Sequence, residues 1–128
     1  MKNQSISKFA FVTMLILFAI GNPNLFGQSL TLLSPNGGEN WLSNSQHNIT
    51  WTSQNITNVS IDYSTDNGSS WLSVISSIPA TAGSYNWTLP SNTPSTQCLV
   101  RISDASNASI NDVSDNVFTI APLIAVTS

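Results

Sequence analysis

Apolar and polar residues alternate along most of the chain, in short stretches separated by turn-forming residues. The clearest alternation places Val59, Ile61 and Tyr63 between polar neighbours. A period of two directs one set of side chains to a buried face and the other to water, which is typical of a β-strand. The other predicted strands follow the same pattern or a short apolar run, and they cover 30–33, 41–42, 47–51, 71–75, 84–89, 98–103 and 117–120.

Turn-forming residues separate these seven or eight predicted strands, and no segment has the period of a helix. The segment 34–39, SPNGGE, predicts a sharp turn, because Pro35 fixes φ while Gly37 and Gly38 permit positive φ. Three prolines fall between strands, where they interrupt no ladder: Pro79, Pro90 and Pro94. The pattern predicts an all-β sandwich of about seven strands, of the immunoglobulin or fibronectin-III type.

The segment 63–71, YSTDNGSSW, matches the Ser-x-Asp-x-Gly-x-x-Trp pattern of an Asp box. Asp boxes recur in every blade of sialidase-type propellers, whereas this chain has one motif and is too short for a propeller. A calcium loop is a second interpretation. The third is a hairpin clasp, in which Asn67 and Gly68 tolerate positive φ. In that clasp Asp66 accepts hydrogen bonds from turn amides while Trp71 folds back onto the core, and this interpretation is favoured.

The N-terminal residues lie outside the predicted sandwich. Lys2 and Lys8 precede or adjoin an unbroken apolar run over 9–20, FAFVTMLILFAI. That run is too short to span a bilayer, which takes roughly 20 residues, but it has the length of a signal-peptide h-region. We predict a signal peptide over 1–27 and therefore a secreted or cell-surface protein. A signal anchor is the alternative.

The rest of the chain divides into one domain and a short tail. Residues 28–121 are predicted to form the sandwich, and about 100 residues are enough to bury a core without disulfides or metals. Residues 122–128 are predicted to be a linker or the first strand of a following repeat, since 124–128, IAVTS, resembles 30–34, LTLLS. A frayed tail is the alternative interpretation. We expect a tandem array in a longer protein.

Removal of the signal peptide makes the chain more acidic. Both lysines leave, so Arg101 alone faces six carboxylates and the net charge falls from −3 to −5. The carboxylates belong to Glu39, Asp62, Asp66, Asp104, Asp112 and Asp115. A surface with one basic group cannot neutralise a run of phosphates, which excludes nucleic-acid binding. Attraction to anionic lipid is excluded for the same reason.

Cys98 is the only cysteine, so no internal disulfide can form. We predict a buried thiol that packs as a small apolar residue, with an intermolecular bridge as the alternative. The core then rests on apolar burial, and each large aromatic side chain buries roughly 150–250 Å². The tryptophans available for it are Trp41, Trp51, Trp71 and Trp87.

Six motifs occur in a fixed order: SPNGGENW at 34–41, NITW at 48–51, VSIDYSTDNGSSW at 59–71, GSYNWTLP at 83–90, CLVRISDASN at 98–107 and SDNVFTI at 114–120. Together they resemble the immunoglobulin-like module of the yeast cell-wall-synthesis KRE/KNH type, in the Ser-Thr-rich GPI-anchored membrane family. The likeness is greatest to the form found in secreted multidomain Bacteroidetes proteins. It implies an extracellular immunoglobulin-like domain beside catalytic or adhesive domains. It supplies no matched functional residues, so the fungal link to β-1,6-glucan assembly is not carried over.

No catalytic residue is predicted, and no cofactor is expected. His47, the only histidine, lies at the start of a strand, and no one serine is marked as its nucleophile. Glu39, the only glutamate, lies in a tight turn with no second carboxylate placed for glycoside hydrolysis. One histidine and one cysteine make a zinc site improbable. These residues favour a chain that is not an enzyme.

The segment 104–115, DASNASINDVSD, concentrates carboxylates, amides and hydroxyls. Ca²⁺ takes 6–8 oxygen ligands, so Asp104, Asp112 and Asp115 are the calcium candidates. The segment lacks the Gly and terminal Glu of an EF-hand loop, and its composition is that of an exposed connection between strands. We therefore predict a connection and no metal.

Carbohydrate binding is the main functional alternative to a structural role. Glycan-binding sandwiches present aromatics on one face, whereas Trp51, Trp71, Tyr85 and Trp87 lie in strands whose alternation suits burial. Trp41, beside the PNGGE turn, is the aromatic to test for exposure. The hypothesis is a non-catalytic spacer or interaction domain of a larger secreted or cell-surface protein, without a membrane span in the mature chain.

The expected partners of this domain are neighbouring domains of the same polypeptide, together with cell-surface glycans or proteins. One alternative is a glycan- or protein-binding adhesion module. Another is an accessory domain of a secreted hydrolase whose catalytic part lies beyond residue 128. The predicted structural motifs are the same in each case: Pro35, Gly37 and Gly38 in the first turn, and Asp66, Gly68 and Trp71 in the second.

Overall fold

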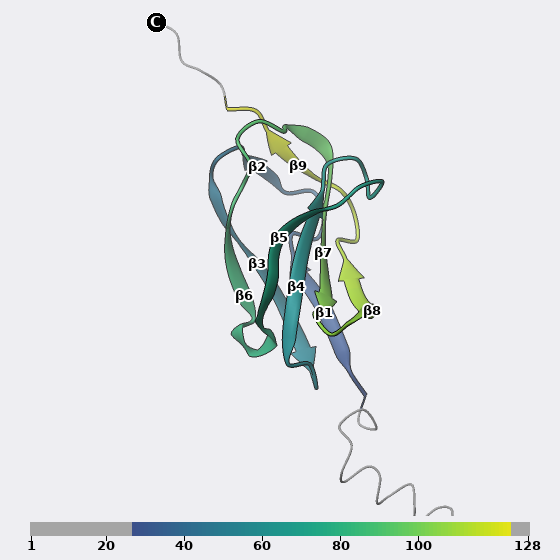
Figure 1. Ribbon diagram of the computed structural model, residues 1–128. Helices are drawn as coiled ribbons and strands as arrows, with labels where there is room; N and C mark the ends of the chain where they lie inside the picture. Colours follow the sequence, from purple (N-terminus) through teal and green to yellow (C-terminus); the bar gives the residue numbers. More distant parts are fainter. Residues whose placement is uncertain (1–26, 124–128) are drawn as a thin grey trace, which may run out of the picture.

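The computed structural model describes residues 27–123, which form two β-sheets packed face to face (Figure 1). The smaller sheet has three antiparallel strands in the order β1 (Ser29–Ser34), β3 (Gln46–Gln54) and β6 (Ser84–Thr88). The prediction of an all-β chain with two layers is confirmed.

The larger sheet has six strands. Their spatial order is β2 (Asn40–Leu42), β9 (Phe118–Ala121), β7 (Ser95–Asp104), β4 (Asn58–Ser64) and β5 (Leu72–Pro79), with β8 (Asn107–Val113) also beside β7. β9 pairs with the first half of β7, and β8 pairs with its second half. All pairs are antiparallel except β2 with β9, which is parallel. A 3-10 turn, η2 (Ala80–Ala82), lies in the connection from β5 to β6, which joins the two sheets.

The strand β8 lies where the sequence analysis predicted an exposed connection, so that prediction is wrong over 107–113. Its side chains are exposed or half-buried. The strand therefore has no buried face, and apolar residues do not alternate along it. Its pairing with β7 runs from Arg101 opposite Val113 to Asp104 opposite Asn107. A strand held by backbone pairing, with little side-chain burial, carries no periodic hydrophobic signal.

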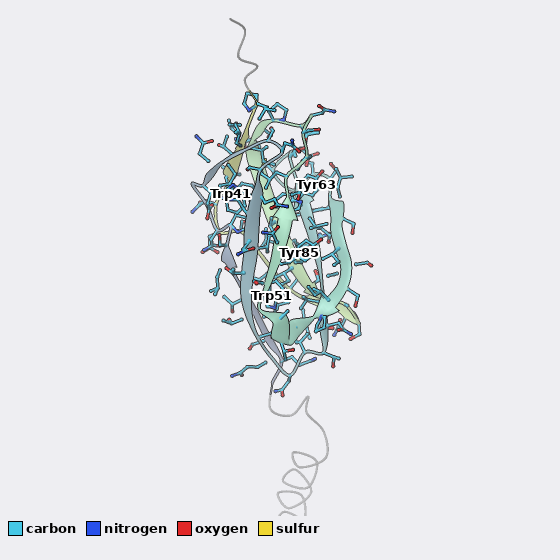
Figure 2. All side chains as sticks on the ribbon, turned by 90° about the vertical axis from the view of Figure 1, so that its left-hand side faces the viewer. Trp41, Trp51, Tyr63 and Tyr85 are labelled. Carbon is cyan, nitrogen blue, oxygen red and sulfur yellow. The ribbon has the colours of Figure 1, made fainter. Side chains whose placement is uncertain are left out.

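The core lies between the two sheets and receives side chains from both. Its buried members are Leu30, Leu32, Ile49, Trp51, Ile56, Val59, Ile61, Ala80, Trp87, Leu89, Cys98, Val100, Ile102, Phe118 and Ile120. Each fully buried large side chain stabilises the fold by roughly 1.5–3 kcal/mol. Trp51 satisfies its polar atom by donating from Nε1 to the Ala80 carbonyl oxygen at 2.9 Å. Figure 2 shows Trp51 in the lower half of the sandwich and Trp41 and Tyr63 in the upper half.

Cys98 is fully buried in this core and carries a free thiol. Burial raises the pKa of the thiol, because the thiolate would lose its hydration in the apolar interior. Its Sγ lies 3.4 Å from the carbonyl oxygen of Ser95 as a weak donor. The prediction of a buried thiol is confirmed.

The sandwich is elongated, and the chain enters and leaves it at opposite ends. β1 begins at the lower end in Figure 1, and β9 ends at the upper end. None of the residues from 27 to 123 forms a helix long and apolar enough to cross a bilayer. The predicted signal peptide, apart from its last residue, and the tail residues 124–128 lie outside the described part of the chain.

Candidate functional site

The segment 64–70 closes on itself through hydrogen bonds, and we call it the clasp. Asp66 Oδ1 accepts from the Ser70 amide at 2.8 Å and from the Ser64 hydroxyl at 2.7 Å. Its Oδ2 accepts from the Ser70 hydroxyl at 2.5 Å. Ser64 Oγ also accepts from the Gly68 amide at 2.8 Å. This is the hydrogen bonding that the hairpin interpretation predicted for Asp66.

The charge of Asp66 is held in place by these donors. The Ser70 hydroxyl, then the Ser64 hydroxyl and the Ser70 amide, lower the pKa of Asp66 from 3.8 to about 2. The turn itself needs left-handed backbone at Asn67 (φ 57°) and Gly68 (φ 91°). Asn and Gly are the residues that adopt this conformation at the lowest cost.

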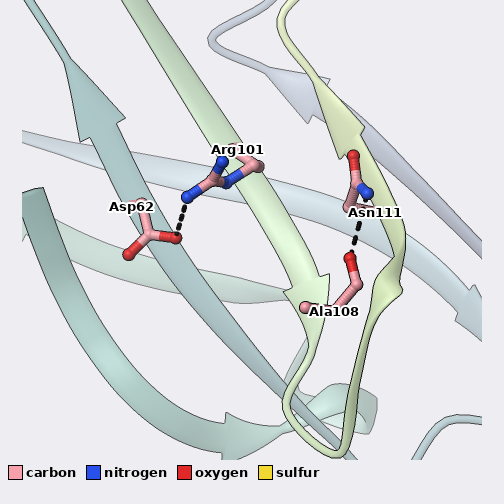
Figure 3. A network of polar contacts seen from close by, with 4 residues as sticks. All are labelled: Asp62, Arg101, Ala108 and Asn111. Carbon is pink, nitrogen blue, oxygen red and sulfur yellow. Dashed lines mark hydrogen bonds and ion pairs between the residues drawn. The ribbon is translucent and has the colours of Figure 1, made fainter. Parts of the chain in front are cut away.

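Trp71 lies on the outer face of the larger sheet, so the expectation that it folds onto the core is wrong. The guanidinium carbon of Arg101 lies 4.2 Å from the centre of its ring. Arg101 also pairs with Asp62, at 3.0 Å between Nη2 and Oδ2 (Figure 3). Both charged residues alternate with buried neighbours on β7 and β4, which directs them outward. Trp71 therefore packs under a cation, a contact worth about 0.5–1 kcal/mol at exposed sites.

A second polar assembly forms where β1 gives way to β2, and we call it the corner: 34–39 together with 114–117. Pro35 is buried, and Gly37 (φ 136°) and Gly38 (φ 85°) have positive φ. Glu39 folds back over the turn, and its two carboxylate oxygens accept from the amides of Asn36 at 2.9 Å and Gly37 at 2.8 Å. The corner transfers the chain from the smaller sheet to the larger one.

Side chains join the two halves of the corner across a long interval of sequence. Asn36 Nδ2 donates to Asp115 Oδ2 at 3.0 Å, and the Asp115 amide donates to Asn36 Oδ1 at 2.9 Å. The buried Ser114 hydroxyl donates to the Pro35 carbonyl oxygen at 2.7 Å. The same oxygen atom of Ser114 accepts from the Val100 amide at 3.0 Å. Ser114 therefore joins its own segment both to the turn at Pro35 and to β7 at Val100.

Backbone bonds reinforce this junction. The Gly38 amide donates to the Val117 carbonyl at 2.9 Å, and the Asn116 amide to the Asn36 carbonyl at 3.1 Å. A side chain at position 37 has no room, because its Cβ would lie 2.6 Å from the Cβ of Asn116. Position 37 therefore requires glycine for two reasons: a Cβ would collide with Asn116, and the positive φ disfavours other residues.

The three calcium candidates lie apart, and each carboxylate accepts hydrogen bonds from a different partner. Asp104 Oδ1 accepts from the Ser106 amide and hydroxyl, both at 2.9 Å. Asp112 Oδ2 accepts from the Leu32 amide of β1 at 2.7 Å, and Asp115 belongs to the corner. Within residues 27–123, no three histidine, cysteine or acidic side chains gather as metal ligands would. The structure does not bring these carboxylates together.

Trp41 is half-buried, and His47 covers one face of its ring. The two rings are stacked with their centroids 4.2 Å apart and an interplanar angle of 2°. Phe118 adds a tilted contact at 5.5 Å, and His47 Nε2 lies 3.0 Å from Ser45 Oγ. The aromatic that was the best glycan-stacking candidate thus has one stacking face taken by an imidazole.

No pocket is present among the described residues. No family model, curated protein or solved structure matches the chain. Sequence reasoning missed the corner contacts of Ser114 and Asp115, the second of which it named only as a calcium candidate. These contacts gave no local signal because their partners lie 79 residues away.

Proposed function

We propose that this chain is a secreted, non-catalytic, immunoglobulin-like module that serves as a spacer or interaction domain of a larger extracellular protein. The strand order supports the immunoglobulin-like type. β1, β3 and β6 occupy the places of strands A, B and E, and β4, β7 and β9 those of C, F and G. β5 then extends the second sheet beyond the C position.

The observation that carries the spacer role is the position of the two chain ends. Because β1 begins at one end of the sandwich and β9 ends at the other, flanking domains would be held apart by its full length (Figure 1). β3 has nine residues, so that length is on the order of 30 Å at about 3.3 Å per residue. A rigid two-layer unit of this kind sets the separation of its neighbours.

The contacts of the histidine and the glutamate considered as catalytic candidates, His47 and Glu39, support a non-catalytic role. The imidazole of His47 is stacked on Trp41, with its Nε2 beside the Ser45 hydroxyl. Both carboxylate oxygens of Glu39 accept backbone amides of its own turn. Each group is thus engaged in holding local structure.

The proposed resemblance to the KRE/KNH-type module agrees with a structural, non-catalytic role. Its most specific motifs, SPNGGENW and VSIDYSTDNGSSW, fall on the corner and on the clasp. Both are assemblies in which polar side chains bond to backbone groups. The two motifs thus stabilise turns of the sandwich, which is consistent with a family whose shared residues maintain the fold.

Expression of the full chain from Met1 in a Gram-negative host tests the export on which this proposal depends. We expect the protein outside the cytoplasm, with Gln28 at its N-terminus when the intact mass is measured. A variant with Leu15→Arg and Leu17→Arg should stay inside the cell, because charges in the apolar run prevent its recognition. Cytoplasmic retention of the unaltered chain with Met1 intact would contradict the proposal.

A second function, adhesion to a glycan, is favoured by the composition of the smaller sheet. Its strands β1, β3 and β6 contain no aspartate, glutamate, lysine or arginine and a single histidine, His47, whereas every described carboxylate lies in the larger sheet or in loops. Amide and hydroxyl side chains line its outer face and bond across strands, as from Asn86 Nδ2 to Asn48 Oδ1 at 3.1 Å. Such a surface offers donors and acceptors to a neutral polysaccharide without charge repulsion.

Affinity electrophoresis in gels that contain neutral polysaccharides distinguishes the two functions. An adhesion module would be retarded, and the double variant Asn48→Ala/Asn86→Ala would migrate faster than the unaltered chain. Ser106→Ala, on a distant loop, is the matched control. Equal mobility with and without polysaccharide would remove the adhesion function and leave the spacer.

A further inference from the structure

The second strand of the domain, β2, lies beside the last strand, β9, although the two chain ends lie at opposite ends of the sandwich. β2 pairs with β9 in parallel, from Asn40 opposite Thr119 to Leu42 opposite Ala121. The chain reaches β2 from the end where β1 begins, and it leaves β9 at the other end (Figure 1). A force that pulls the two ends apart therefore slides β2 against β9 along their common axis.

Sliding two paired strands differs from peeling them apart. When a force acts along the strands, all hydrogen bonds between them bear load together and must break at nearly the same time. When it acts across the strands at one end, the bonds break one after another. Each bond is weak by itself, so simultaneous loading decides how much force the pair withstands.

Several hydrogen bonds join the segments 35–43 and 114–121. The Thr119 amide donates to the Glu39 carbonyl at 2.8 Å, and the Ser43 amide donates to the Ala121 carbonyl at 2.8 Å. The buried Ser43 hydroxyl donates to the same Ala121 carbonyl at 2.7 Å. At the other end of the pair lie the reciprocal bonds of Asn36 with Asp115. Side-chain bonds thus strengthen both ends of the sliding interface.

We infer that the corner and the β2–β9 pair form a mechanical clamp, and that this domain bears tensile force transmitted through its two ends. The inference rests on the proposed spacer function and adds that the spacer withstands tension. β1 adds a second loaded pair, because its antiparallel partner β3 resists movement along the same axis, from Ser29 opposite Gln54 upward. The clasp at 64–70 lies in the β4–β5 connection, which bears no load until the terminal strands separate.

Single-molecule pulling of the full chain, with handles fused at Gln28 and Leu123, tests the clamp. Asn36→Ala removes both side-chain bonds to Asp115 and should lower the unfolding force. Asp66→Ala, in the clasp, is the matched control. At equal loss of chemical stability, we expect the fall in force to be at least about twofold larger for Asn36→Ala, because only that variant removes bonds from the loaded interface.

The direction of pulling supplies a second test that leaves every residue of the corner and of the β2–β9 pair unchanged. Handles at Gln28 and Asn55 attach to neighbours at one end, since Gln28 Nε2 lies 3.1 Å from the Asn55 carbonyl oxygen. Pulling there peels β1 from β3, and we expect a markedly lower force than between Gln28 and Leu123. Cysteine handles are usable because the native Cys98 is fully buried.

Equal unfolding forces in the two pulling directions would overturn the clamp. It would also be overturned if Asn36→Ala and Asp66→Ala lowered the unfolding force only in proportion to their loss of free energy of unfolding. If Asn36→Ala does not fold, Ser43→Ala replaces it, since it removes one hydroxyl bond and leaves the backbone bond to Ala121. These results are independent of the export experiment. A chain retained in the cytoplasm with a strong clamp would contradict the proposed function alone.

Discussion

The clasp and the corner are both glycine-containing turns stabilised by an acidic side chain, but their bonds span different lengths of chain. In the clasp, Asp66 and Ser64 bond to groups at most four residues away. In the corner, Asn36 and Pro35 bond to residues 79 positions distant. The clasp therefore shapes one hairpin, whereas the corner fixes the two sheets to each other. Loss of the corner is expected to affect the whole sandwich and loss of the clasp only its own end.

The largest effect is expected from Gly37→Ala. The added Cβ would lie 2.6 Å from Cβ of Asn116, at a φ of 136° that side chains rarely adopt. Strain and overpacking together should lower the free energy of unfolding by about 2–5 kcal/mol. Urea denaturation followed by tryptophan fluorescence measures this. Gly38→Ala, where no atom lies within 4 Å of the added Cβ, is the control and should cost less.

Ser114→Ala should give the next largest effect. The change leaves the buried Val100 amide without its side-chain acceptor and the Pro35 carbonyl without its donor. An unsatisfied buried group costs about 1–3 kcal/mol, so the midpoint of urea denaturation should fall accordingly. The matched control is Ser106→Ala, which removes one exposed hydroxyl at the Asp104 turn. A Ser114→Ala protein as stable as its control would show that the corner does not join the sheets.

In the clasp, Asp66 should make stability depend on pH over a narrow acidic range. The pKa of this carboxylate is lowered from 3.8 to about 2, with the Ser70 hydroxyl as the main cause. A lowered carboxyl pKa stabilises the fold above its unfolded value, and this stabilisation is lost as pH falls from 3.8 to about 2. Asp66→Asn should lack that part of the pH dependence. Identical acid titrations of stability in the two proteins would contradict the clasp.

The smallest effect is expected from Asn86→Ala on the edge strand β6. It removes an exposed side-chain bond to Asn48 that belongs to neither turn. Surface changes of this kind usually shift the free energy of unfolding by no more than about 0.5 kcal/mol in either direction. Thermal denaturation should therefore leave its melting temperature close to that of the unaltered chain. A large loss of stability would mean that the smaller sheet depends on its outer face.

The same contrast explains how much the amino-acid sequence predicted. The period of two located the strands that bury one face, such as β4 with Val59 and Ile61. The clasp was readable because its partners are adjacent in the chain. The strand β8 was missed because it buries little, and Trp71 was placed in the core because its packing under Arg101 depends on a strand 30 residues away.

The corner illustrates the limit most clearly. Pro35, Gly37 and Gly38 predicted a turn, but nothing near them indicated that Ser114 and Asp115 would complete it. Those two residues stand in a polar segment that its composition assigned to an exposed connection, with Asp115 named only as a calcium candidate. Their role became visible only when the fold brought the two segments together.

Native-state hydrogen exchange tests most directly the claim that the corner joins the sheets while the clasp holds one hairpin. We expect the corner amides of Gly38 and Asn116, and the adjoining amide of Thr119 that donates to Glu39, to exchange only through global unfolding, with the free energy that urea denaturation gives. The clasp amides of Gly68 and Ser70 should exchange through local opening at a clearly lower free energy. Corner amides that exchange as easily as those of the clasp would contradict this account.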